Sequence, residues 1–201
     1  MLLHSVVVLV SFMICRCHAN ADVVAAWEAL KMDKGYFLVD RSYPDPERTT
    51  CVYLINRKPI DKRVKFEASF AHLKDGKYAE QAYVIQAETG DGDKTMFNAS
   101  TVSMENGTVF TFKLEFVDHS FRCWVVKRLP DEDPKDPACM LWARREYACK
   151  TDQLKECYEK YRRLACNSKG IPELRCKNQN TSCPRPCAYE DDDDQTHRSC
   201  I

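Results

Sequence analysis

Hydrophobic and polar residues alternate along most of the chain between Gly35 and Tyr147. The pattern is clearest in the segment VFTFKLEFV, where every second residue is apolar, and the apolar face consists of Phe110, Phe112, Leu114 and Phe116. A period of two is typical of a β-strand with one buried face. Similar patterns predict strands over residues 36–43, 50–56, 63–72, 78–86, 95–102, 121–127 and 139–145. About eight short strands in series, with no helix between them, predict an all-β fold, either an antiparallel sandwich or an up-and-down barrel.

Helical spacing replaces this alternation on both sides of the strand region. Residues 22–32, DVVAAWEALKM, have the pattern of a short amphipathic helix. Residues 151–165 have that of a longer helix, whose apolar face consists of Leu154, Cys157, Tyr158, Tyr161 and Leu164. Thr151 is the expected N-cap of this helix. Cys157 is therefore expected to face whatever surface the helix covers.

The two ends of the chain differ from this central region. Residues 1–14 are apolar except for His4, Ser5 and Ser11, which predicts a secretory signal peptide over residues 1–19. The structured domain is expected over residues 20–166. Residues 167–201 are rich in cysteine, proline and acidic residues, so we expect a tail held by disulfides rather than by a helix or sheet of any length.

Charge and cysteine content narrow the classes of function. Removing Arg16 with the signal leaves 29 basic residues against 30 acidic ones, so there is no basic excess for binding nucleic acid. The signal also contains two of the twelve cysteines, and an even ten remain, as in a secreted protein with a disulfide framework. No cysteine or histidine cluster has the spacing of a zinc site, and neither a cofactor nor a membrane span is expected. Three Asn-x-Ser/Thr motifs are candidate glycosylation sites: Asn98, Asn106 and Asn180.

Cys123 lies within a predicted strand and needs a partner that packs against the barrel wall. Cys157 is the best candidate, because its helix must bury an apolar face and the barrel is the only sizeable surface. Such a bridge would stabilise the fold by roughly 3–4 kcal/mol through loop closure. The alternative is that Cys123 is a free buried thiol.

A series of short motifs resembles the tick salivary lipocalins, and most closely their histamine-binding branch. In order along residues 26–166, the motifs are Ala26-Trp27-Glu-Ala-Leu30, a Gly-Tyr-Phe strand, Thr50-Cys51-Val52, Asn106-Gly-Thr-Val-Phe-Thr111, Cys123-x-Val125, Leu141-Trp142 and a helical Cys157. The resemblance implies an eight-stranded lipocalin barrel that is closed at one end, with a C-terminal helix packed outside. It also implies a Cys123–Cys157 bridge and a second bridge between Cys51 and Cys176. It assigns no partner to Cys139, Cys149, Cys166, Cys183, Cys187 or Cys200.

The resemblance also implies an amine pocket, but three of its acidic positions are replaced here. Amine binders of this family carry carboxylates where this chain has Phe112, Trp124 and Met140. Only Asp45 and Glu80 (or Gln81) match their remaining amine ligands. A buried ammonium group costs several kcal/mol unless acids and hydrogen bonds meet it, whereas apolar walls favour hydrocarbon. An apolar mediator such as a fatty acid, an eicosanoid or a sterol is therefore favoured over histamine.

The expected ligand-binding residues are Tyr36, Asp45, Glu80, Phe110, Phe112, Trp124, Met140 and Trp142. The alternative for Phe112, Trp124 and Met140 is that they fill the barrel as core and bind nothing. Tyr36 and Trp142 are equally compatible with wall or core. His72 shares the Phe70 face of its strand and is expected as a lining residue, while His119 is expected at the surface.

The expected function is capture of a small host mediator by a secreted, salivary, monomeric protein that helps to evade host defence. The alternative is a protein–protein inhibitor that presents the acidic segment from Tyr189 to Asp194 to a host protein. An enzyme is the least supported class, because no hydrolase, metalloprotease or phosphate-loop motif occurs.

Overall fold

The computed structural model describes residues 26–30, 35–43, 49–61, 65–74, 77–87, 93–101, 109–130, 137–164, 166, 176–177, 180–181 and 183. The predicted signal peptide and the acidic segment of the tail lie outside these residues. Neither α2 nor α3, the two helices of the described part, has the length and apolarity to cross a membrane.

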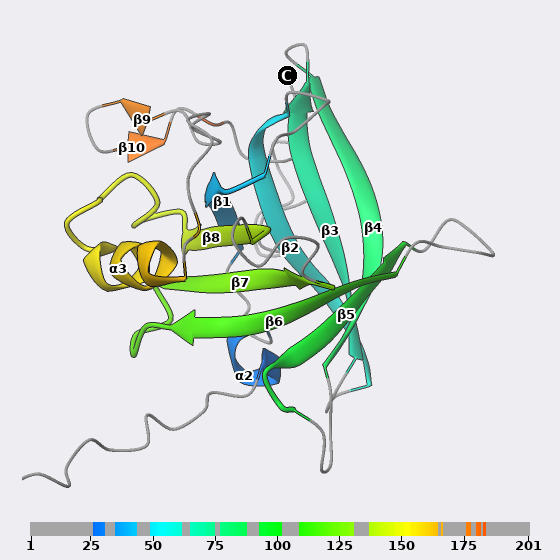
Figure 1. The fold of residues 1–201 in the computed structure, drawn as a ribbon. Coiled ribbons are helices and arrows are strands. Elements are labelled where there is room, and N and C mark those ends of the chain that lie inside the picture. The colour runs from blue at the N-terminus through cyan, green and yellow to red at the C-terminus, as the bar shows by residue number, and fades with distance from the viewer. Residues whose placement is uncertain are drawn as a thin grey trace, which may run out of the picture.

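Eight antiparallel strands form a closed barrel, in which each strand pairs with the next and β1 pairs with β8 (Figure 1). The strands are β1 (Tyr36–Arg41), β2 (Thr50–Asp61), β3 (Lys65–Lys74), β4 (Lys77–Ala87), β5 (Met96–Thr101), β6 (Val109–Val117), β7 (Cys123–Leu129) and β8 (Cys139–Arg144). Closure confirms the predicted barrel and excludes the sandwich. Helix α2 (Ala26–Leu30) lies at one end of the barrel, where the amide of Ala26 donates to the carbonyl of Lys94 at 2.7 Å.

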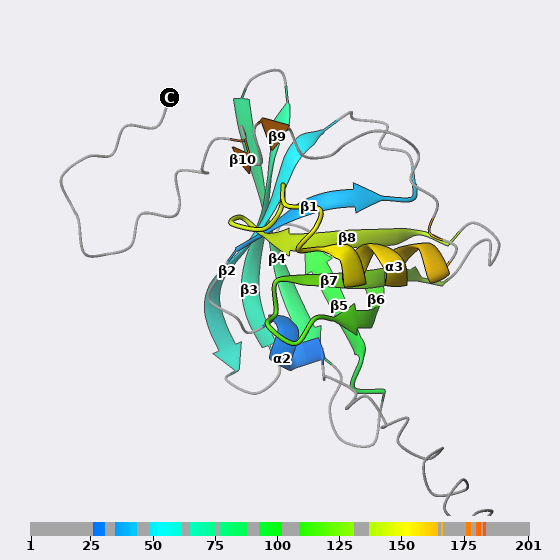
Figure 2. The same cartoon turned by 90° about the vertical axis from the view of Figure 1, so that its left-hand side faces the viewer.

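Helix α3 (Lys155–Arg163) packs across the outside of the barrel over β7 and β8 (Figure 2). The expected cap at Thr151 is wrong. Hydrogen-bonded turns occupy residues 150–154, and Leu154 takes the N-cap position without a side-chain hydrogen bond. The reason is packing, because Leu154 is fully buried while Thr151 is exposed.

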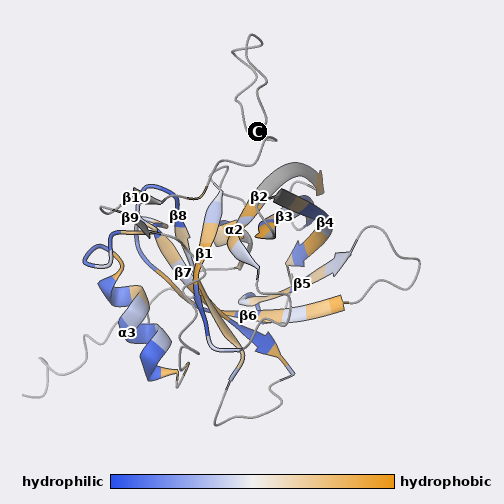
Figure 3. Ribbon diagram, turned by 90° about the horizontal axis from the view of Figure 1, so that it is seen from above, coloured by the Kyte–Doolittle hydropathy of each residue, from blue (hydrophilic) through white to orange (hydrophobic). Residues whose placement is uncertain are grey.

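Alternating residues divide into an inner and an outer apolar cluster. The inner cluster includes Tyr36, Leu38 and Trp124, and the outer cluster under α3 includes Phe37, Val39 and Val125. Figure 3 shows hydrophobic residues interspersed along the strands, while α3 is predominantly hydrophilic. Strands β1, β7 and β8 begin with four or more consecutive buried residues, because the barrel interior covers one face and the helix side covers the other.

A register shift in β6 changes the predicted face of one phenylalanine. The pairing with β7 is irregular between Leu114 and Phe116. Leu114 belongs to the inner cluster, but Phe116 packs against the outer one, and Val117 takes the inner side. The expectation that Phe116 shares a face with Phe110 and Phe112 is therefore wrong, because a β-bulge shifts the alternation by one residue.

Three disulfides attach the segments after β8 to the barrel. Cys123–Cys157 joins β7 to α3, as expected, and Cys139–Cys166 joins β8 to a residue three positions after the end of that helix. Cys149 is disulfide-bonded as well.

The third bridge corrects the expected Cys51–Cys176 pair, because Cys51 is bonded to Cys183. Cys176 instead lies in a small hairpin of β9 (Cys176–Lys177) and β10 (Asn180–Thr181), where its backbone pairs with Thr181. The chain turns back at this hairpin, and the cysteine that reaches β2 is the one beyond it. The tail thus contains a minimal sheet in which each strand has two residues.

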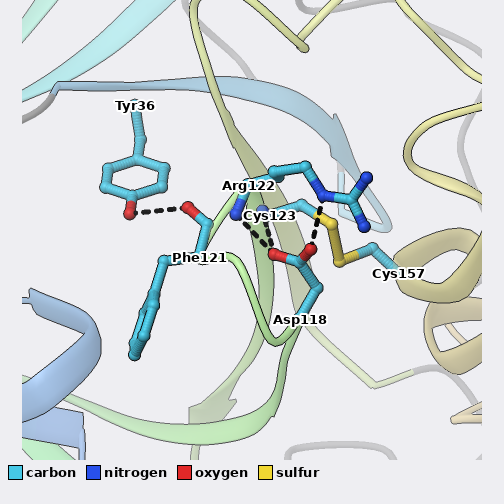
Figure 4. Close-up of polar contacts among 6 residues, drawn as sticks. All are labelled: Tyr36, Asp118, Phe121, Arg122, Cys123 and Cys157. Carbon is cyan, nitrogen blue, oxygen red and sulfur yellow. Dashed lines mark hydrogen bonds and ion pairs between the residues drawn. A yellow bond between two sulfur atoms is a disulfide. The ribbon is translucent and has the colours of Figure 1, made fainter.

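A buried carboxylate organises the turn between β6 and β7, beside the Cys123–Cys157 bridge (Figure 4). Asp118 is 1% exposed and accepts hydrogen bonds from the amides of Arg122 and Cys123 and from Arg122 Nε, the last at 2.6 Å. The hydrogen bond to Asp118 raises the pKa of Arg122. Phe121 has a φ of 52°, and its carbonyl accepts from the Tyr36 hydroxyl at 3.1 Å.

Replacing Asp118 with asparagine should lower the free energy of unfolding by about 2–3 kcal/mol, because the amide removes the charge and, with its oxygen on the two backbone N–H groups, turns its NH2 donor toward the N–H donor of Arg122 Nε. The matched control is Asp93→Asn, since the exposed Asp93 accepts from the amide and hydroxyl of Thr95 in a similar turn. Urea denaturation of both variants gives the comparison. Equal losses in the two variants would contradict the structural role of Asp118.

Candidate ligand-binding cavity

The barrel encloses a cavity of about 260 Å³. Most of its walls are aliphatic or aromatic, and the polar lining residues are Arg41, Tyr43, Thr49, His72, Tyr83 and Arg128. The volume lies just below the range of roughly 300–1,000 Å³ that is common for drug-sized ligands. A compact ligand is therefore favoured, or one that is only partly enclosed.

The strand register distinguishes two ends of this cavity. Leu30 of α2 lines one end, which we call the α2 end. Trp124 lies nearer this end, because it pairs with Val117 beside the β6–β7 turn. Arg41 pairs with Met140 at the C-terminal end of β1, and Arg128 pairs with Phe112 near the C-terminal end of β7. Both positions are far from α2. We call that side the arginine end.

Aromatic rings form much of the wall. Trp124 and Trp142 are stacked with centroids 5.6 Å apart and an interplanar angle of 13°. Phe97 and Phe112 form a second stack with centroids 5.2 Å apart. Phe70 contacts Trp142 edge-on. Stacked and edge-on pairs add to the stability gained from area burial alone, so these rings give the cavity a defined shape.

Five of the expected ligand-binding residues line the cavity together: Phe110, Phe112, Trp124, Met140 and Trp142. His72 also lines it, and His119 is exposed, as expected. Phe112, Trp124 and Met140, which stand where the similar amine binders carry acids, therefore line a cavity. The barrel interior is not filled throughout by side chains. Their role in binding remains a proposal.

Two expected residues do not line the cavity. Tyr36 is buried behind Trp124, with ring centroids 5.4 Å apart in an edge-on contact, and its hydroxyl is bonded to Phe121. Burial raises the pKa of this tyrosine. Glu80 is exposed, because β4 turns Tyr83 and Ile85, which have the opposite parity, toward the cavity. Gln81 shares the parity of Tyr83 but is also exposed and does not line the cavity. Asp45 lies outside the described residues.

Sequence reasoning missed Arg128, although the alternation contained the signal. Arg128 is four residues after Trp124 on β7, and Val126 between them also lines the cavity. Its guanidinium carbon lies 4.8 Å from the centroid of the Phe110 ring, a favourable cation–π distance. Among the described residues, no carboxylate lies within ion-pair distance of Arg128.

Arg41 was missed for a different reason, which is a β-bulge in β1. The pairing with β8 shifts between Leu38 and Asp40. Strict alternation from the inward Leu38 would turn Asp40 into the cavity and Arg41 out of it. The bulge reverses this order, so that Arg41 lines the cavity and packs on Tyr43.

Asp40 consequently lies on the helix side of the wall. Burial first, and then the Asp40 charge, raise the pKa of Tyr158 in α3 to about 12. The same two causes raise the pKa of Tyr161. Ser42, two residues after Asp40, holds the end of β1 against β8, because its backbone N–H donates to the Cys139 carbonyl and its hydroxyl accepts from the Cys139 N–H at 2.8 Å.

The described lining residues include two arginines and a histidine but no aspartate or glutamate. Burial raises the pKa of Tyr83, so its phenol is neutral at physiological pH and available as a hydrogen-bond donor. No group of three or more histidine, cysteine or acidic residues in the described part could hold a metal ion. The cavity can therefore offer apolar area, hydrogen bonds and positive charge.

No protein-family model and no curated protein sequence matches the chain. A crystal structure of AM182 in complex with serotonin has a TM-score of 0.52 and 16% sequence identity, over 77% of this chain and 92% of that one. The fold is that of a lipocalin. Japanin from Rhipicephalus appendiculatus bound to cholesterol has a TM-score of 0.49 and 11% identity, over 71% of this chain and 93% of that one.

Filling the lipocalin cavity should block it without unfolding the barrel. Ala99 lines the cavity, and its neighbour Ser100 faces outward, with its hydroxyl toward the Val84 carbonyl. Ala99→Leu should weaken binding of the neutral fluorophore 1-aminoanthracene by about tenfold or more, since overpacking costs roughly 1–3 kcal/mol. Ser100→Leu is the control and should keep the affinity of the wild type. Equal affinities in all three proteins would show that the fluorophore binds elsewhere.

Proposed function

We propose that the chain is a secreted salivary lipocalin of the tick type that captures a small, largely apolar mediator carrying a negative charge. The observation that carries this proposal is the aromatic cavity with Arg41 and Arg128 at one end and no acid among its described lining residues. The motif series from Ala26 to Cys157 supports the family, and the lipocalin fold agrees with it.

The charge pattern disfavours the family's amine ligands. An ammonium group that leaves water needs carboxylates and hydrogen bonds to offset several kcal/mol of desolvation. The described walls offer it guanidinium groups instead. A carboxylate is the natural partner of arginine, because the two can form paired charge-assisted hydrogen bonds.

The apolar part of the ligand gains from the aromatic and aliphatic walls. Burial contributes roughly 25 cal/mol per Å², or about 0.8 kcal/mol for each methylene group. A medium-length carboxylate chain fits both features: its chain lies toward the α2 end and its head group at the arginine end. Fatty acids and compact eicosanoid-like acids are of this type.

Secretion and a role outside the cell fit the covalent structure. Three described disulfides are typical of an oxidising compartment. Asn98 is one of the candidate glycosylation sites and lies on the outer face of β5, where its side-chain carbonyl accepts from the Thr111 hydroxyl at 2.8 Å. Asn106 lies outside the described residues, and only the backbone of Asn180, in β10, is described.

Capture of this kind is stoichiometric, so the protein would act as a monomeric sink that lowers the free mediator concentration and thereby blunts a host defence. Inhibition of a host protein through the acidic tail stays a prediction, because that segment lies outside the described residues.

The test is the loss of the Arg128 charge. Arg128→Gln should weaken binding of dodecanoate by about tenfold or more, because a hydrogen-bonded ion contributes roughly 1.5–3 kcal/mol. Lys127→Gln is the matched control on the same strand, since alternation turns Lys127 away from the cavity. Titration calorimetry with dodecanoate and serotonin measures both variants and the wild type. Tighter binding of serotonin than of dodecanoate, or an unchanged dodecanoate affinity in Arg128→Gln, would contradict the proposal.

A further inference from the structure

One disulfide has only one of its two cysteines assigned. Cys149 is disulfide-bonded, but the three bridges Cys51–Cys183, Cys123–Cys157 and Cys139–Cys166 join the other bonded cysteines of the described residues to one another. The partner of Cys149 is therefore none of those six. Once the predicted signal peptide is removed, the cysteines left as candidates are Cys176, Cys187 and Cys200.

Cys149 lies in a backbone segment that is held in place, the hydrogen-bonded turns between β8 and α3. The amide of Ala148 donates to the carbonyl of Arg144 at 2.9 Å, and the amide of Lys150 donates to the carbonyl of Tyr147 at 2.7 Å. Ala148 belongs to the outer apolar cluster, and the half-buried Cys149 packs against that cluster. The partner cysteine must therefore reach these turns, because the turns are already fixed.

The β9–β10 hairpin lies beside the same turns. Figures 1 and 2, which view the molecule from two perpendicular directions, both show the hairpin next to the loop between β8 and α3. Cys183 follows β10 by two residues, and its bond to Cys51 holds that end of the hairpin against β2. Cys51 and Cys183 belong to the same outer cluster as Ala148. A disulfide requires Cα atoms within about 4–7 Å, so a partner from this hairpin is well placed.

Cys176 is the candidate that the hairpin positions. It begins β9, and its backbone pairs with Thr181, two residues before the anchored Cys183. A sheet with two residues in each strand is too small to be stable by itself, so it needs covalent attachment. The Cys51–Cys183 bridge attaches only the β10 side, and a bond from Cys176 attaches the β9 side as well.

We propose that Cys149 is bonded to Cys176, so that the hairpin is attached to the barrel through both of its strands. The bond forms by thiol–disulfide exchange, in which two protein thiols become one disulfide. A disulfide donor of the secretory compartment, such as oxidised glutathione, is reduced to two thiols in the same exchange. The inference does not depend on which ligand the cavity takes.

This pairing has a consequence for the acidic tail. The mature chain is expected to have ten cysteines, and four bridges leave only Cys187 and Cys200. A bond between these two closes a covalent loop that contains the acidic segment from Tyr189 to Asp194. A closed loop samples fewer conformations than an open tail, so it loses less entropy on binding a basic surface of another protein.

Mass spectrometry of a non-reduced tryptic digest of the secreted protein tests the pairing without any variant, with free thiols alkylated before digestion. Cys149 lies in the peptide 146–150 and Cys176 in the peptide 176–177, and each has no other cysteine. We expect these two peptides to be joined and to separate on reduction. Peptide 146–150 joined instead to 178–198 or 199–201, or alkylated at Cys149, would overturn the proposal.

Alkylation of two serine variants gives a second readout. Cys176→Ser should leave Cys149 as a free thiol that is alkylated without reduction. Cys187→Ser is the matched control, and it should leave Cys149 bonded and free Cys200 instead. Alkylation of Cys149 in the control but not in Cys176→Ser would contradict the proposed bond.

Discussion

Alternation along the strands of the closed barrel decides which side chains face the cavity, and each β-bulge shifts that alternation by one residue. The bulge between Leu38 and Asp40 has the largest consequence, because it turns a carboxylate toward α3 and a guanidinium into the cavity. One backbone irregularity thus sets the sign of the charge at the arginine end. Ser42 holds it in place through its hydrogen bonds with Cys139.

The wall that carries the stacked Trp124 and Trp142 is attached to the rest of the molecule at several points. The first four residues of β7 and the first five of β8 are buried on both faces, and α3 covers the outer face. A disulfide ties Cys123 of β7 to α3, and another ties Cys139 of β8 to Cys166, shortly after that helix. Asp118 fixes the turn that leads into β7. A wall held at so many points can keep the two stacked indole rings in a fixed position against the cavity.

Much of this arrangement could be predicted from sequence, and the misses have identifiable physical causes. Local alternation predicted the strands, and the apolar face of the helix predicted the Cys123–Cys157 bridge. The alternation along β7 also places Arg128 on the same face as Trp124, but this signal was overlooked. Arg41 and Phe116 were out of reach because bulges depend on pairing with another strand. The Cys51–Cys183 bridge depends on the β9–β10 hairpin, whose two-residue strands leave no periodic signal.

The central claim is that the cavity selects for negative charge on an apolar ligand. Its most direct test is a charge series on one chain length, in which dodecanoate, dodecanol and dodecylamine are titrated into the protein under identical conditions. We predict that the acid binds most tightly, by about tenfold over the alcohol, and that the amine binds most weakly. Tightest binding by the amine would contradict the account, because it would require an acid in the cavity where the structure places arginine.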